Sequence, residues 1–185
     1  MYKNQVKKNY KQGFNHVVQS KNLTVRHLLF FFREATYSEN DFVLITSNPN
    51  KGCSAMVGTG YKMLNQFRFD KHRHSQYLNL AQNCYSLSTI LHELFHTLGV
   101  LHTHARNDRD QHVTIHWENI RPDQQFNYCK ENSGQTSTYG VEYDAKSFMH
   151  YAAYNAFAID MSKPTITSKV KNNFIKSYLL GFFQI

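Results

Sequence analysis

The stretch from Ser86 to Leu98 constrains this chain most, because its apolar residues repeat with the period of a buried helix. They recur at three- and four-residue spacing, which places them on one helical face. Ser86 or Ser88 can cap the amino end, and Gly99 can end the helix by adopting a positive φ. The apolar positions are Leu87, Ile90, Leu91, Leu94, Phe95 and Leu98. The pattern predicts a buried helix over 86–98.

Two histidines on this helix, His92 and His96, lie four positions apart. That spacing separates them by about 40° around the axis and by one turn along it, so both rings can reach one ion. A sharp exit from the helix at Gly99 can return His102 to the same point. Three neutral imidazoles with an open fourth position are typical of a catalytic zinc site. We therefore expect one Zn²⁺ per chain, bound by His92, His96 and His102.

Glu93 follows the first histidine and can lie beside the metal without being a ligand. Zinc lowers the pKa of a bound water toward about 7, and a carboxylate can take that proton and pass it to the leaving amine. The sequence thus predicts a zinc-dependent endopeptidase with Glu93 as the general base. In a chain with 11 histidines the short H-E-x-x-H pattern can arise by chance, but the longer H-E-x-x-H-x-x-G-x-x-H pattern is specific.

The region from His92 to His102 and the residues after it resemble the astacin family of metzincin proteases. The likeness continues at His104, Arg106, Asp108, Arg109, Asp110, Val113, Ile115, Trp117, Asn119 and Ile120. Tyr143-Asp144 and the run Ser147-Phe148-Met149-His150-Tyr151 resemble the Met-turn of that family. The resemblance extends over residues 30–167 and is strongest over 84–151.

The resemblance implies one α+β domain over residues 1–185 with a zincin-like fold. A twisted mixed sheet and helices would form an upper subdomain, 1–99, which contains the active-site helix. An irregular lower subdomain, 100–185, would contain the Met-turn, with the active-site cleft between the two. Met149 would lie beneath the metal. Tyr151 would be catalytic, as an additional zinc ligand that swings to support the oxyanion.

Cys53, Cys84 and Cys129 allow three pairings by sequence alone. The resemblance implies a Cys53–Cys84 disulfide and leaves Cys129 as a free thiol. It also implies that substrate lies extended along an edge strand at residues 53–57. A disulfide predicts a secreted protein, and the Asn22-Leu23-Thr24 glycosylation sequon agrees with this, although no signal peptide is visible.

The sequence departs from the family near both ends. Thr103 stands where astacins usually have a glutamate that contacts the buried amino terminus, and the strand normally preceding the 4–22 segment is missing. A second family disulfide, from the region near Leu28 to the C-terminus, lacks both of its cysteines. We therefore expect a domain truncated or diverged at both ends, with the tail over 174–185 packed on its body.

Shorter signals complete the predicted organisation of the chain. Spacing of apolar residues predicts an amphipathic helix over 4–22, and a Pro-Asn-Lys-Gly cluster predicts a turn over 48–52. Little periodicity follows Gly99, apart from a turn-rich stretch over 122–132. Predicted strands cover 28–32, 42–46, 54–57 and 77–80.

The formal charge of +8 allows a nucleic-acid partner, and residues 68–74 are the densest basic stretch. The lysines are spread over both ends without a nucleic-acid fold signature, so we expect no nucleic-acid partner and interpret 68–74 as a solvated loop.

No segment has the roughly 20 apolar residues of a membrane span. We expect a monomer that acts on protein or peptide substrates without a membrane partner. The main alternative is a zinc-binding pseudoprotease that binds polypeptide without cleaving it.

Overall fold

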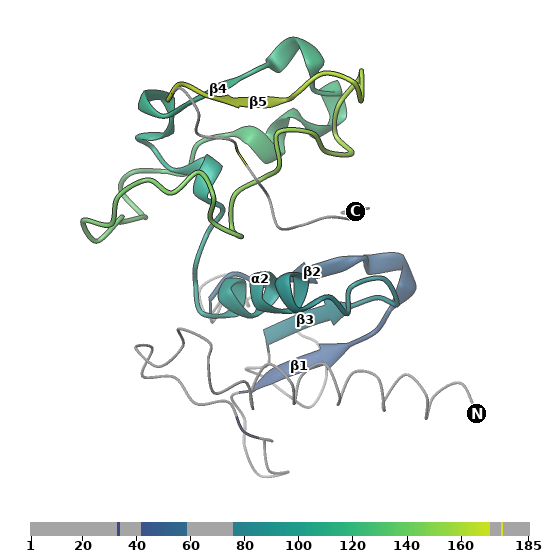
Figure 1. Cartoon of the computed structure of the whole chain (residues 1–185). Coiled ribbons are helices and arrows are strands. Elements are labelled where there is room, and N and C mark those ends of the chain that lie inside the picture. The colour runs from purple at the N-terminus through teal and green to yellow at the C-terminus, as the bar shows by residue number, and fades with distance from the viewer. Residues whose placement is uncertain (1–32, 34–41, 59–75, 171–174, 176–185) are drawn as a thin grey trace. The chain divides into compact units, whose positions relative to one another are not determined.

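The computed structural model describes residues 33, 42–58, 76–170 and 175. The chain divides into two compact units, one before and one after the peptide bond between Val100 and Leu101 (Figure 1). The predicted helix over 4–22, the strand over 28–32, the loop over 68–74 and the sequon at Asn22 lie outside the described residues. So does the tail over 174–185, except for Ile175.

The first unit contains a three-stranded mixed sheet in the order β1-β3-β2. Strand β1 (Val43–Thr46) runs parallel to β3 (Gln76–Leu80), and β2 (Cys53–Ala55) runs antiparallel to it. The three strands predicted at 42–46, 54–57 and 77–80 are confirmed with shifted ends. The central strand β3 therefore has one parallel and one antiparallel neighbour.

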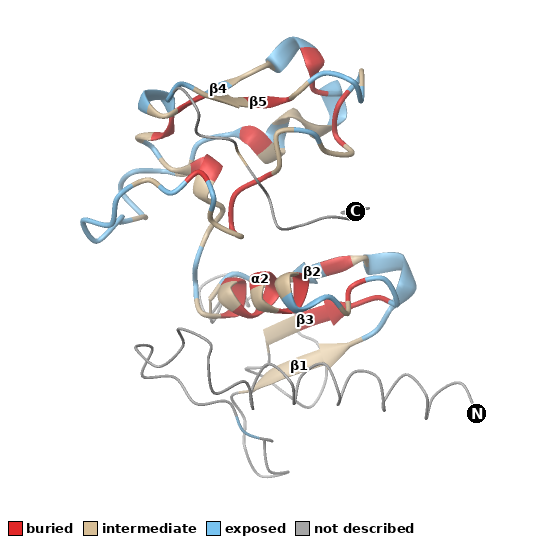
Figure 2. Cartoon of the chain, in the orientation of Figure 1, coloured by how far each residue is buried: buried red, intermediate tan, exposed pale blue. Residues whose placement is uncertain are grey.

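Helix α2 (Leu87–Thr97) packs on this sheet against β2 and β3. Ile90 and Leu94 of the helix and Leu78 and Leu80 of β3 are buried. Figure 2 shows buried segments on both elements. The predicted helix over 86–98 is confirmed, with Ser86 rather than Ser88 as its N-cap. Its amphipathic period thus places one stripe in the core.

A buried amide side chain fixes the connection between β1 and β2. Asn79 Nδ2 donates to the carbonyl oxygens of Asn48, at 2.9 Å, and Gly52, at 2.7 Å. Its Oδ1 accepts from the Asn48 amide and from the Thr46 hydroxyl. The connection itself is a 3-10 turn over Pro49–Lys51, in the predicted turn cluster. Asn79 therefore satisfies four polar groups of this turn and its flanks.

The second unit has little regular structure, as predicted. Strand β4 (Val113–Ile115) pairs antiparallel with β5 (Ile166–Ser168), and much of the remaining chain forms 3-10 turns and loops. The turn-rich stretch over 122–132 contains a 3-10 helix, Pro122–Tyr128. The core of this unit consists of Val113, Ile120, Tyr128, Tyr151, Phe157 and Ile166.

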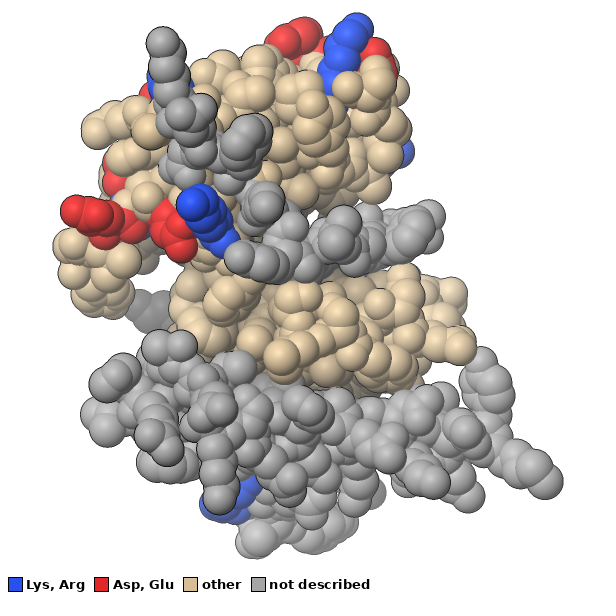
Figure 3. Space-filling view, viewed as in Figure 1, with Lys and Arg blue, Asp and Glu red and all other residues tan. Residues whose placement is uncertain are grey.

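Charges of both signs adjoin one another on the described surface of the second unit (Figure 3). Arg106 pairs with Asp108 at 2.7 Å, and Lys163 pairs with Asp160 at 3.1 Å. These pairs are close in sequence, so they stabilise local turns.

In the part of the chain that the structure describes, the helices are too short or too polar to cross a membrane.

Candidate metal centre

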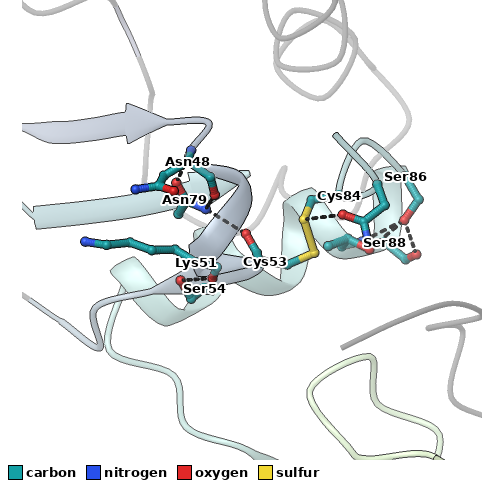
Figure 4. The surroundings of a disulfide bond; sticks show 11 residues. Asn48, Lys51, Cys53, Ser54, Asn79, Cys84, Ser86 and Ser88 are labelled. Carbon is teal, nitrogen blue, oxygen red and sulfur yellow. Dashed lines mark hydrogen bonds between the residues drawn. A yellow bond between two sulfur atoms is a disulfide. The ribbon is translucent and has the colours of Figure 1, made fainter. Parts of the chain in front are cut away.

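The amino end of α2 is fixed by a cap and a disulfide (Figure 4). The Ser86 hydroxyl accepts a hydrogen bond from the Thr89 amide at 3.2 Å. Cys84, two residues before the cap, is bonded to Cys53 at the start of β2. The predicted Cys53–Cys84 disulfide is confirmed, and Cys129 is an exposed free thiol. The bridge ties the start of the helix to the edge strand of the sheet.

Two buried imidazoles meet one turn apart on α2. Nε2 of His92 and Nε2 of His96 are 3.1 Å apart. Two ligands of a tetrahedral zinc ion with Zn–N bonds of about 2.0–2.1 Å would be about 3.3 Å apart, so the spacing fits one ion. His92 is fully buried and His96 is nearly so.

The protonation of His96 suits metal binding. Its Nδ1 lies 2.8 Å from the carbonyl oxygen of Val100. A carbonyl can only accept, so Nδ1 carries the proton and donates, which leaves the ring lone pair on Nε2. Burial lowers the pKa of His96, while the bond to Val100 acts in the opposite direction. The neutral ring is the form that binds metal.

Glu93 lies between these two histidines in sequence, and its side chain is also buried. Among the described residues, its Oε2 is a buried oxygen without a hydrogen-bond partner. Burial raises the pKa of Glu93 to about 8. A buried carboxyl oxygen without a partner is costly, and a cation or a polar ligand beside it would remove that cost.

The carboxyl end of α2 turns sharply at Gly99, which has φ +90°. The Gly99 amide still donates to the carbonyl oxygen of His96 at 2.9 Å, and the Gly58 amide donates to the same oxygen at 2.8 Å. The predicted positive φ at Gly99 is confirmed. This turn starts the chain toward His102.

His102 lies among aromatic rings of the second unit. Its ring is 4.8 Å from that of Tyr151 and 5.2 Å from that of His104, between ring centroids. The next residue, Thr103, donates its amide to the carbonyl oxygen of Met149 at 2.9 Å. Met149 itself is buried. The segment predicted to form a Met-turn thus bonds to the backbone directly after His102.

One group of three histidines in the described part of the chain could hold a metal ion. His92, His96 and His102 each offer a ring nitrogen, and these atoms lie within 4.8 Å of one another. An all-imidazole donor set suits zinc better than the hard cations that prefer oxygen ligands. The unpartnered oxygen of Glu93 is consistent with a cation nearby.

Three residues near Tyr151 had no predicted role of their own. His104 and His150 are fully buried, and the Tyr143 hydroxyl forms a hydrogen bond of 2.7 Å with Nε2 of His150. All three occur within the segments that resemble astacins, but neither spacing nor composition distinguishes them from surface residues. The burial of the two histidines and the hydrogen bond of Tyr143 reveal them.

Comparison with known proteins agrees with this geometry. The family model for astacin, a peptidase family, matches residues 1–181. Tolloid-like protein 1 of Mus musculus is 34% identical over 151 residues, which are 82% of this chain and 14% of that protein. Zinc metalloproteinase nas-15 of Caenorhabditis elegans is 35% identical over 137 residues, 74% of this chain and 21% of that protein. The chain thus spans only a small part of the length of these relatives.

A solved structure supports the fold. High choriolytic enzyme 1, a hatching enzyme zinc-protease from Oryzias latipes, superposes with a TM-score of 0.62 at 31% identity. The match covers 80% of this chain and 66% of that one. It confirms the predicted α+β, zincin-like class. With the family match over nearly the whole sequence and the histidine cluster on α2, these likenesses show that the chain belongs to the astacin family of peptidases.

Proposed function

We propose that this protein is a zinc-dependent endopeptidase that cleaves extended polypeptides. The observation that carries the proposal is the buried Glu93 carboxyl group, one oxygen of which has no hydrogen-bond partner. It lies on the helix that brings Nε2 of His92 to within 3.1 Å of Nε2 of His96. A site that only held a metal would not require a carboxyl group there. Membership of a peptidase family supports the same activity.

His92, His96 and His102 are the residues that would hold the ion. Their neutral imidazoles supply three donors and leave room for a further ligand. When bound, zinc supplies a Lewis acid and lowers the pKa of water toward about 7. The hydrogen bond from His96 Nδ1 to Val100 orients that ring, as a ligand's outer partner does.

Glu93 would act as the general base and then as the acid. Its carboxylate takes the proton of the attacking water and delivers it to the amine that leaves. Burial raises the pKa of Glu93 in the absence of an ion, and a bound cation would lower it toward the range in which both transfers are efficient. Tyr151 would donate its phenol proton in a hydrogen bond to the negative charge that develops on the carbonyl oxygen.

The substrate would lie along β2, one of the two outer strands of the described sheet. Its outer edge, unpaired among the described residues, can bond to the backbone of an extended chain, whatever most of its side chains are. The exposed side chain of Ser54 and the partly buried Ala55 lie on this strand. The Cys53–Cys84 bridge fits a secreted enzyme, because such bonds persist outside the cytosol.

The test compares cleavage of a denatured protein substrate by the wild type and Glu93→Ala, each with and without a chelator. We expect cleavage only by the zinc-loaded wild type, while both proteins bind one zinc ion. If both bind zinc and polypeptide but neither cleaves, the pseudoprotease alternative is correct. If neither binds zinc at micromolar concentration, the three-histidine site is wrong.

A further inference from the structure

Both backbone polar groups of Tyr151 bond to buried histidine side chains. The Tyr151 amide donates to Nδ1 of His104 at 3.3 Å, and its carbonyl oxygen lies 2.7 Å from Nδ1 of His150. The His104 ring also stacks on the Tyr151 ring, with centroids 3.9 Å apart and planes inclined by 29°. Tyr151 is therefore held at its amide, its carbonyl and its ring.

These contacts require opposite tautomers of the two histidines. A backbone amide only donates, so His104 accepts at Nδ1 and carries its proton on Nε2, which donates to the Asn127 carbonyl oxygen at 3.0 Å. A backbone carbonyl only accepts, so His150 donates from Nδ1. Nε2 of His150 must then accept, and the Tyr143 hydroxyl donates to it at 2.7 Å.

We propose that His104, His150 and Tyr143 form a tyrosine clamp that positions the Tyr151 phenol for transition-state stabilisation. The inference rests on the proposed function, in which that phenol donates to the developing oxyanion. The three are positioning residues, because they act through Tyr151. A donor to an oxyanion contributes most when its approach is defined in advance, and bonds to the Tyr151 backbone fix the point from which its side chain swings.

Two side chains contact the Tyr143 ring and hold it in place. Its ring stacks on His112 with centroids 4.5 Å apart and planes inclined by 5°. The Arg106 guanidinium lies 5.3 Å from its centroid and donates to the Val141 carbonyl oxygen at 3.0 Å. The hydroxyl therefore stays directed at His150, where its bond to Nε2 holds the ring that bonds to Tyr151.

Loss of the Tyr143 hydroxyl would leave Nε2 of the buried His150 ring without the donor that bonds to it. The proton would stay on Nδ1, because the Tyr151 carbonyl oxygen still requires a donor. The ring would be held at one nitrogen only, so its bond to Tyr151 would be less well fixed. The phenol of Tyr151 would become less well positioned, although its own chemistry would be unchanged.

Tyr128 provides a matched control in the same core. Its ring packs 5.6 Å from that of Tyr151, but its hydroxyl bonds to Asn155 at 3.0 Å and Thr165 at 3.1 Å. Tyr128→Phe therefore removes a buried hydroxyl from a ring that packs near Tyr151, and it keeps the ring that contacts His104. A purely structural role for such hydroxyls predicts equal effects of Tyr128→Phe and Tyr143→Phe.

The kinetic experiment uses the full, zinc-loaded chain. We expect Tyr143→Phe to lower kcat about tenfold with KM nearly unchanged, and Tyr128→Phe to preserve kcat. In a Tyr151→Phe background, Tyr143→Phe should cause no further loss, because both act through one phenol. Equal losses in the two tyrosine variants, or a full additional loss in that background, would overturn the clamp.

A second readout does not depend on activity. Nitrogen-15 NMR of histidine-labelled protein should show His150 protonated on Nδ1 in the wild type and in Tyr128→Phe. Tyr143→Phe should keep that tautomer and move the Nε2 resonance downfield, because this nitrogen loses its hydrogen-bond donor, whereas Tyr128→Phe should leave it in place. A wild type with His150 protonated on Nε2 refutes the clamp. If the wild type shows the expected tautomer but cleaves nothing, the proposed function fails and the hydrogen-bond arrangement stands.

Discussion

Gly58 and Gly99 pack backbone to backbone at the carboxyl end of α2. A Cβ added at Gly58 would lie 3.6 Å from the Gly99 Cα, and both residues have positive φ. The Gly58 amide also donates to the carbonyl oxygen of His96 at 2.8 Å. The end of the helix that presents His96 is thus closed by two glycines distant in sequence.

Gly99→Ala tests this turn. A Cβ at position 99 would meet the Gly58 Cα at 3.9 Å, an ordinary contact, so the cost comes from φ +90°. We expect the free energy of unfolding to fall by about 1–2 kcal/mol and zinc affinity to fall as well. Urea unfolding and zinc titration measure both.

Gly134→Ala is the control for that substitution. Gly134 is exposed, has no positive φ, and a Cβ there would meet its nearest atom at 3.5 Å. Its stability and zinc affinity should equal those of the wild type. Equal losses in both variants would mean that the Gly99 conformation has no special importance.

In the metal-free protein, the contribution of Glu93 to stability should be lost as pH rises. The Glu93 pKa is about 8 when folded, against 4.5 for the unconstrained group. Between these values the folded state holds a proton that the unfolded state releases, so the free energy of unfolding falls by up to about 1.4 kcal/mol per pH unit. Stability from this group is complete below about pH 4.5 and lost by about pH 8.

Glu93→Gln isolates that effect, because it keeps the shape of the side chain and removes its titration. Melting temperatures of both proteins in chelator, measured from pH 5 to 8, should converge at low pH and diverge at high pH in favour of the variant. Parallel curves would show that the folded state does not raise the pKa of Glu93.

Removal of the Cys53–Cys84 disulfide should destabilise the first unit. The bond closes a loop with a sequence separation of 31 residues, for which chain entropy gives about 3–4 kcal/mol. The double variant Cys53→Ser, Cys84→Ser should lose about that much in urea unfolding. Cys129→Ser, at an exposed free thiol, should lose nothing measurable.

Asn79→Asp should disrupt the connection between β1 and β2. It replaces the amide group that donates to the Asn48 and Gly52 carbonyl oxygens with a second acceptor. We expect a loss of about 2–4 kcal/mol in the free energy of unfolding. Asn50→Asp is the control, because its side chain is exposed on the same turn. Similar losses in both variants would contradict the special role of Asn79.

The sequence determined the local features of this protein. The apolar repeat over 86–98 specified α2, and the motif on it specified His92, Glu93 and His96, because helical periodicity fixes which side chains share a face. Cap and exit residues marked its ends. Alternation and turn residues located three strands, but not their order or direction.

Only the tertiary structure decided features that depend on residues distant in sequence. It placed β3 between a parallel and an antiparallel neighbour, which makes β1 and β2 the outer strands of the described sheet. Sequence alone left three cysteine pairings open, and folding brings Cys53 to Cys84. Burial gives His104 and His150 their tautomers, because the partner of each ring nitrogen is set by packing rather than by spacing.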